Sequence, residues 1–126
     1  IKNQKSKTTS FSMHEISLVR NIFNTLESEF SKAELGNLSA IDLRVGKLSN
    51  VEPILMQNAF EAVTTAEDKY QQVRLNIEVV PIEIYCSACD ARSTIEDYKF
   101  ACAACGQPNN NVVKGTELLI HRVHFG

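Results

Sequence analysis

Four cysteines, arranged as two pairs, constrain the fold of this chain more than any other feature of its sequence. The pairs are Cys86-Ser87-Ala88-Cys89 and Cys102-Ala103-Ala104-Cys105, and they contain every cysteine of the 126-residue chain. A gap of two residues lets both sulfurs of a pair point toward one metal ion, and four thiolates at about 2.3 Å are typical of tetrahedral structural zinc. The spacing therefore predicts one zinc site formed by all four cysteines.

Two other interpretations of the cysteines stay open on the sequence alone. A disulfide framework suits secreted proteins, but the N-terminal residues lack the apolar stretch of a secretion signal. A redox pair of the thioredoxin type needs one Cys-x-x-Cys pair, whereas this chain has two matched pairs. Four protein ligands leave no position on the ion for a substrate, so we expect a structural site in a protein that is not an enzyme. Gly106 is expected to supply the positive φ of a tight metal-binding turn.

Hydrophobic periodicity on either side of the cysteines predicts the other elements. Apolar residues recur at helical spacing over residues 13–31, and apolar and polar residues alternate over 41–45, as in a strand with one buried face. A second helix is expected over 52–66. Alternation returns from residue 73 toward 85, and residues 117–125 read as a last strand. Pro81 is expected to mark an edge or a bulge.

These elements predict an α+β fold in which two helices pack on a three-stranded mixed β-sheet, with an inserted zinc-ribbon-like satellite that carries the four cysteines. The strand–helix–strand part is expected to be a right-handed parallel unit. We assign residues 1–12, which are rich in Lys, Ser and Thr, to a disordered leader or the remnant of an added sequence. Residues 13–84 with 109–126 form the expected α/β domain, and 85–108 form the expected zinc-binding domain.

The same patterns predict one helix start and a buried core. Ser49 and Glu52 have the spacing of a capping box, with Pro53 in the first helical turn. The residues expected to be buried together are Ile16, Val19, Phe23, Leu43, Val45, Ala59, Ile77, Val79, Leu118 and Ile120.

Charge and hydropathy argue against two classes of function. The net charge is −2, and removing the three lysines of residues 1–12 leaves −5 for the remainder. An acidic chain with few basic residues around its cysteines is a poor match to a nucleic-acid partner. The sequence has no run of about 18–20 apolar residues, the length that a membrane-spanning helix needs.

Several motifs occur in an order that resembles a known family. Met13-His14-Glu15 stands at the start of the first helix, and Val45-Gly46-Lys47-Leu48 closes the first strand. The segment 51–60, the two cysteine pairs and Glu117-Leu118-Leu119-Ile120 follow. With these motifs, residues 13–124 resemble the HypA/HybF nickel-insertion metallochaperones.

The resemblance implies a function in nickel delivery. It implies a cytoplasmic protein that carries Ni²⁺ to a hydrogenase large subunit, or to urease, together with a nickel-handling GTPase, as a monomer or homodimer. It also implies that Met13, His14 and Glu15 hold the nickel, with His14 as the essential ligand, while Zn²⁺ stays on the cysteines.

Other interpretations of these residues remain. Ser12 and Glu15 have capping-box spacing, so Glu15 alternatively caps the helix and His14 is a surface residue. His121 and His124 are three apart and would lie on opposite faces of a regular strand. The whole chain is alternatively a zinc-ribbon module that binds a protein or nucleic acid without delivering nickel, or a thiol redox regulator.

Overall fold

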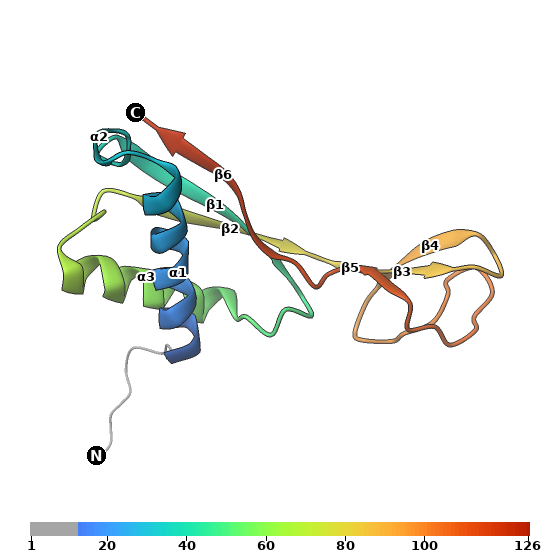
Figure 1. Ribbon diagram of the computed structural model, residues 1–126. Coiled ribbons are helices and arrows are strands. Elements are labelled where there is room, and N and C mark those ends of the chain that lie inside the picture. The colour runs from blue at the N-terminus through green and yellow to red at the C-terminus, as the bar shows by residue number, and fades with distance from the viewer. Residues whose placement is uncertain (1–12) are drawn as a thin grey trace, which may run out of the picture.

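A computed structural model describes residues 13–126, so the predictions for residues 1–12 lie outside the described part of the chain (Figure 1). The elements in chain order are α1 (Met13–Glu29), α2 (Lys32–Leu35), β1 (Leu38–Gly46), α3 (Pro53–Glu67), β2 (Arg74–Val80), β3 (Ile82–Cys86), β4 (Ala91–Ile95), β5 (Val112–Lys114) and β6 (Leu118–Phe125).

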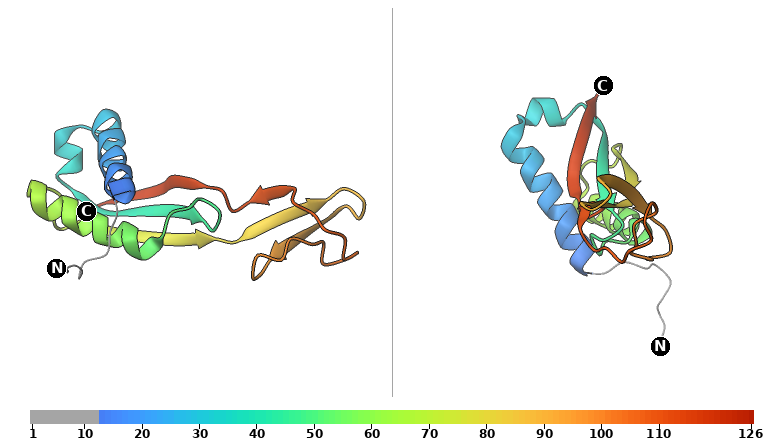
Figure 2. Two further views of the ribbon diagram at one scale, coloured as in Figure 1. Left: turned by 90° about the horizontal axis from the view of Figure 1, so that it is seen from below. Right: turned by 90° about the vertical axis from the view of Figure 1, so that its right-hand side faces the viewer.

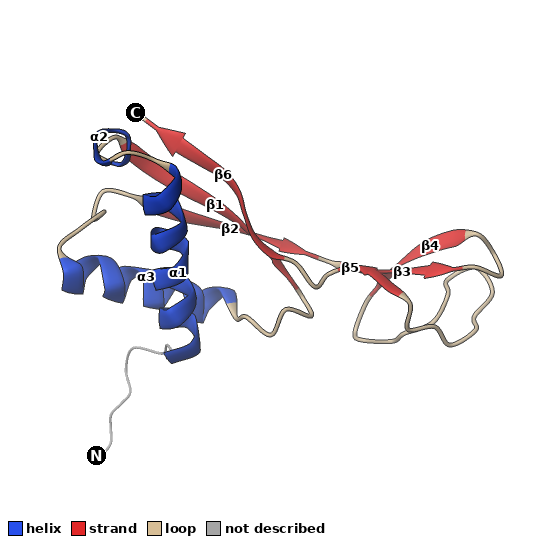
Figure 3. Cartoon of the chain, in the orientation of Figure 1, coloured by secondary structure: helices blue, strands red, loops and turns tan. Residues whose placement is uncertain are grey.

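The strands form two separate three-stranded sheets, which Figure 3 shows in red. In the first sheet the order is β2-β1-β6, with β2 parallel and β6 antiparallel to the central strand β1. In the second sheet the order is β4-β3-β5, and both pairs are antiparallel. The predicted α+β fold with a mixed sheet and a four-cysteine satellite is therefore confirmed.

The helices and the first sheet form one compact part, and the second sheet extends from it as an elongated arm (Figure 2). We call the part with α1, α2, α3 and the sheet β2-β1-β6 the body. Residues 82–114, with β3, β4, β5 and the cysteine loops, are called the arm. Two chain segments connect them: β2 continues into β3 through Pro81, and residues 115–117 lead from β5 back to β6.

The main core lies between the helices and the inner face of the body sheet. It is built on the buried residues of β1 together with those of α1 and α3, as the helical and alternating patterns predict. Phe23 of α1 stacks on Phe60 of α3, with ring centroids 5.5 Å apart, and on Tyr70, at 4.6 Å. Of the predicted core, Val19, Phe23, Leu43, Val45 and Ala59 are buried, and Ile16, Ile77 and Ile120 are partly buried.

Two predicted core residues are exposed instead. Val79 is 44% exposed and Leu118 is 38% exposed. Both pair with Val45, the last β1 residue before Gly46, so the alternation assigned them to the correct face. They lie on the two outer strands, at the end of the sheet nearest the arm. Only the central strand β1 has a neighbouring strand on each side. Strand alternation predicts which face a residue occupies, but burial also needs a covering element.

The predicted capping box of the second long helix is wrong. The N-cap residue of α3 is Glu52, and no side chain accepts a hydrogen bond from the first backbone N–H groups of this helix. Pro53 in the first turn has no N–H, so one fewer donor needs a partner. The hydroxyl oxygen of Ser49 is buried without a hydrogen-bond partner in the described structure. A capping box forms at the short helix α2 instead, where Ser31 and Glu34 each accept a hydrogen bond from the other's backbone N–H.

Candidate metal centres

The arm brings all four cysteines together. Cys86 ends β3, Cys89 lies in the turn that follows, and Cys102 and Cys105 lie in the loop after β4. Their sulfur atoms all lie within 4.8 Å of one another, and those of Cys86 and Cys105 are 4.0 Å apart. Four sulfurs at 2.3 Å from a central ion would be about 3.8 Å apart, so the cluster has the size of a tetrahedral zinc–thiolate site.

Each cysteine pair is followed by a residue with left-handed backbone geometry. Gly106 after the second pair has a φ of 76°, as predicted, and Asp90 after the first pair has a φ of 51°. Asp is among the few non-glycine residues that adopt this geometry readily. The carboxylate of Asp90 accepts a hydrogen bond from the Tyr85 hydroxyl at 2.7 Å, which raises the pKa of Tyr85. The sequence analysis did not identify Asp90, although its place after the first pair matches that of Gly106 after the second.

Hydrogen bonds hold the second cysteine turn in place. The backbone N–H of Gly106 donates to the carbonyl of Cys102 at 2.8 Å, and the N–H of Cys102 donates to the carbonyl of Gln107 at 2.9 Å. The buried hydroxyl of Ser93 on β4 accepts from the N–H of Ala103 at 3.0 Å. The strand β4 thus supports the metal-binding loop, although the sequence analysis did not predict that strand.

Hydrogen bonds within the cluster shift the ionisation of two of its thiols in opposite directions. Backbone amides of Cys105 and Ala104 lower the pKa of Cys102 to about 6, because an N–H aimed at the sulfur stabilises the thiolate. Hydrogen bonding to the Cys105 sulfur and burial raise the pKa of Cys89 to about 12. Close thiols therefore resist losing all their protons together, and a divalent cation offsets that repulsion.

The residues of the second predicted metal site, Met13, His14 and Glu15, form the first turn of α1. His14 is exposed, whereas the Glu15 side chain is only 3% exposed and makes an interaction within the structure. Within residues 13–126, only the four cysteines form a group of three or more His, Cys, Asp or Glu side chains close enough to share an ion. His14 therefore lies at the surface, whereas Glu15 is covered by the rest of the body.

The last strand differs from the prediction at His121. Asp42 pairs with Arg122 and Leu43 pairs with Ile120, so His121 is the extra residue of a β-bulge. The bulge reverses the alternation, and His121 and His124 both lie beside Asp42 rather than on opposite faces.

The Nε2 atom of His124 is 2.8 Å from a carboxylate oxygen of Asp42. His121 lines a shallow cavity that also includes Asp42. Hydrogen bonds from Asn76 and His124 lower the pKa of Asp42.

The body with its parallel β1-α3-β2 unit and the arm with its four-cysteine cluster define a class of small metal-handling proteins with a zinc-ribbon-like extension. The family model for the hydrogenase/urease nickel incorporation metallochaperone HypA matches residues 13–125. The chain therefore belongs to the HypA family, whose members are metallochaperones rather than enzymes, as predicted.

Relatives and solved structures agree with this assignment. The hydrogenase maturation factor HypA of Roseiflexus sp. (strain RS-1) is 32% identical over 114 residues, which cover 90% of this chain and 92% of that protein. The HypA of Campylobacter jejuni is 29% identical over 111 residues, covering 88% and 97%. A solution structure of a HypA protein superposes with a TM-score of 0.63 at 21% identity, covering 90% and 97%. That of the Ni metallochaperone HypA from Helicobacter pylori gives 0.59 at 19%, covering 88% and 96%.

None of the helices in residues 13–126 is sufficiently long and apolar to cross a membrane. This finding agrees with the absence of a long apolar run in the sequence.

Proposed function

We propose that this chain binds one Ni²⁺ ion at residues 13–15 and delivers it to a nickel enzyme, either the large subunit of a [NiFe]-hydrogenase or urease. The observation that supports this proposal is the family match over residues 13–125, which begins at Met13-His14-Glu15. The exposed position of His14 at the start of α1 suits a cargo that has to be passed on.

Nitrogen ligands provide the selectivity that nickel delivery requires. An amine, adjacent backbone amides and an imidazole form a square plane of nitrogens, a geometry that Ni²⁺ accepts and Zn²⁺ does not favour. In this proposal His14 supplies the imidazole. Because the Glu15 carboxylate is buried in the body, we infer that Glu15 contributes through its backbone rather than its side chain.

The chemical state of the Met13 nitrogen determines how tightly the proposed site binds nickel. In the 126-residue chain, Ser12 acylates this nitrogen, so it is an amide and has to lose a proton before it binds nickel. A form that begins at Met13 has an amine there instead. We therefore propose that the form beginning at Met13 binds nickel more tightly.

A structural Zn²⁺ ion on Cys86, Cys89, Cys102 and Cys105 accompanies the nickel in this proposal. Thiolates in a tetrahedral cluster select zinc, and the spacing of the four sulfurs fits that ion. The two metals thereby bind to different residues and require different geometries, so cargo and structural ion do not compete.

We further propose a cytoplasmic location and a nickel-handling GTPase as partner. The names of the relatives place them in hydrogenase maturation, and the acidic charge of the chain does not favour nucleic acid.

Restoration of a nickel enzyme in cells tests this function. The form beginning at Met13 is expressed in a bacterium whose own HypA gene is deleted, and hydrogenase and urease activities are measured at limiting nickel. We expect recovery with the unaltered chain and with His121→Ala, which removes another exposed histidine, but not with His14→Ala. Recovery with His14→Ala equal to that of the unaltered chain would overturn the role of the N-terminal site.

A further inference from the structure

The body and the arm are two units with a narrow connection. In the described chain their sheets share no strand pair, and the arm has a small hydrophobic cluster of its own, formed by Ile82, Ile84 and Ile95. One of the two connecting segments is the single exposed residue Pro81, and the other is residues 115–117. Two units joined in this way move relative to each other unless a further contact restrains them.

The arm has a strained turn at the end nearest the body. Ile95, the last residue of β4, pairs with Ile82, the first residue of β3, so the turn after β4 lies beside the junction. A backbone hydrogen bond of 3.2 Å closes this turn over residues 96–99, and both central residues are left-handed, with φ of 55° at Asp97 and 57° at Tyr98. Asp adopts this geometry readily, but a bulky residue such as Tyr is an outlier there. Strained residues cluster at functional sites, so the place of Tyr98 calls for a reason.

Tyr98 faces the body across the junction. Together with body residues at the carboxyl ends of β1 and β2 and at the start of α3, it lines a cavity of about 270 Å³. The apolar part of this lining includes Val51, Pro53 and Val79, and Val79 is the predicted core residue that remains 44% exposed. Tyr98 itself is 63% exposed. A tyrosine ring suits such a place, because its apolar part can cover apolar side chains while the hydroxyl stays in water.

We propose that Tyr98 is a positioning residue that restrains the arm on the body. Its ring rests against Val79, and the left-handed turn directs it there. Because the ring is largely exposed, the contact is weak, and the arm exchanges between a populated seated orientation and a minor released one. The seated orientation keeps the four-cysteine cluster in a fixed place relative to α1, and on release the arm turns about Pro81 and residues 115–117. This restraint does not depend on nickel at residues 13–15.

Nuclear magnetic relaxation of the backbone amides in the zinc-loaded chain tests the restraint. We expect arm and body amides to share one rotational correlation time in the unaltered chain and in Tyr98→Phe, which keeps the ring. Tyr98→Gly removes the ring and suits the left-handed backbone, so the arm should retain zinc but lose the common value and tumble faster. Asp97→Gly is the matched control, since it relieves the neighbouring left-handed residue, keeps the ring and should leave the common value unchanged. Independent tumbling of the arm in the unaltered chain, or equal effects of both glycine substitutions, would overturn the proposal.

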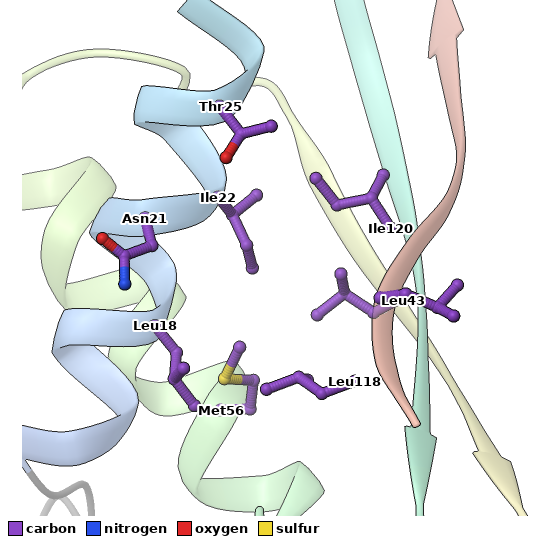
Figure 4. Close-up of a pocket in the computed structure, with 9 residues that line it drawn as sticks. Leu18, Asn21, Ile22, Thr25, Leu43, Met56, Leu118 and Ile120 are labelled. Atoms are coloured by element: carbon purple, nitrogen blue, oxygen red, sulfur yellow. The ribbon is translucent and has the colours of Figure 1, made fainter. Parts of the chain in front are cut away.

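Substitutions on the body test the same contact without altering the arm. Val79→Ser removes the apolar wall that faces Tyr98 and should also free the arm. Leu118→Ser is the control, because Leu118 pairs with the same residue, Val45, and is 38% exposed, but lines a different cavity. Figure 4 shows this second cavity, an apolar groove between β6 and α1 with Leu18 on its helical side. A common correlation time in Val79→Ser, or the same change in Leu118→Ser, would refute the contact between Tyr98 and the body.

Discussion

Gly46 and Gly115 lie against each other where the body meets the arm, and neither has room for a side chain. A Cβ on Gly46 would overlap with the carbonyl of Gly115 and lie 2.8 Å from the backbone nitrogen of Glu117. A Cβ on Gly115 would lie 2.8 Å from the Cα of Ile82. Backbone hydrogen bonds of 2.7 Å from Gly46 to Glu117 and from Leu48 to Gly115 hold the contact.

Substitution of Gly46 should therefore destabilise the junction. Gly46→Ala is expected to lower the free energy of unfolding by about 1–3 kcal/mol, because the backbone of residues 115–117 has to move. Gly36→Ala is the control, since Gly36 has ordinary helical geometry and its nearest atom would be 3.4 Å away. Denaturant unfolding of both variants measures the difference, and equal effects would show that the junction tolerates a methyl group.

The aromatic stack in the core predicts a large loss of folding stability for Phe23→Ala. Phe23 is buried between Phe60 and Tyr70, so its removal should cost about 3–5 kcal/mol of unfolding free energy. Ile54→Ala, at an exposed position of α3, should cost little. A loss below about 1 kcal/mol for Phe23→Ala would mean that the stack does not form.

Tyr70 predicts a loss of stability at alkaline pH. Burial, followed by the hydrogen bond to Glu27, raises the pKa of Tyr70 from 10.0 to about 12. Between these values the unfolded chain releases the phenolic proton while the folded chain keeps it, so the free energy of unfolding falls as pH rises. Ultraviolet titration should show one tyrosine ionising near pH 12 that disappears in Tyr70→Phe. Tyr98→Phe removes an exposed tyrosine instead, and the titration of this control should still show the ionisation near pH 12.

Loss of one cysteine should unfold the metal-binding part of the arm. We expect one zinc per chain, and Cys102→Ser should release it and disorder residues 85–108, because metal binding and folding are coupled in small sites. Ala103→Ser, at the exposed neighbouring position, should retain the metal. Acidification should also release zinc, since protons compete for the thiolates. Elemental analysis of the purified chain checks this prediction, which fails if zinc is well below one per chain and the thiols are paired as disulfides.

Long periodic segments and the cysteine spacing predicted most of the fold. The helical stripe of α1 and the alternation of β1 depend on local sequence, and the Cys-x-x-Cys pairs specify a shared ion at short range. Strands β4 and β5 were missed. They have five and three residues, and the pairing with β3 that stabilises them cannot be recognised from so short a pattern.

The wrong predictions concern residues whose environment depends on a neighbouring element rather than on the local sequence pattern. His121 joins a bulge because of its register with β1, which no pattern within β6 specifies. Val79 has the alternation of a buried residue but lies on an outer strand near the end of the sheet. Ser49 has the spacing of a helix cap, yet Pro53 lets the helix start without one.

Calorimetric titration with Ni²⁺ tests the central claim most directly. Three zinc-loaded proteins are compared: the 126-residue chain, the form beginning at Met13, and that form with His14→Ala. We predict one nickel per chain at micromolar affinity for the form beginning at Met13. Binding by the 126-residue chain should be weaker and shifted to higher pH, and His14→Ala should abolish it with zinc retained. Equal nickel affinity in all three proteins would contradict the account, because Met13-His14-Glu15 would then be only the start of a helix.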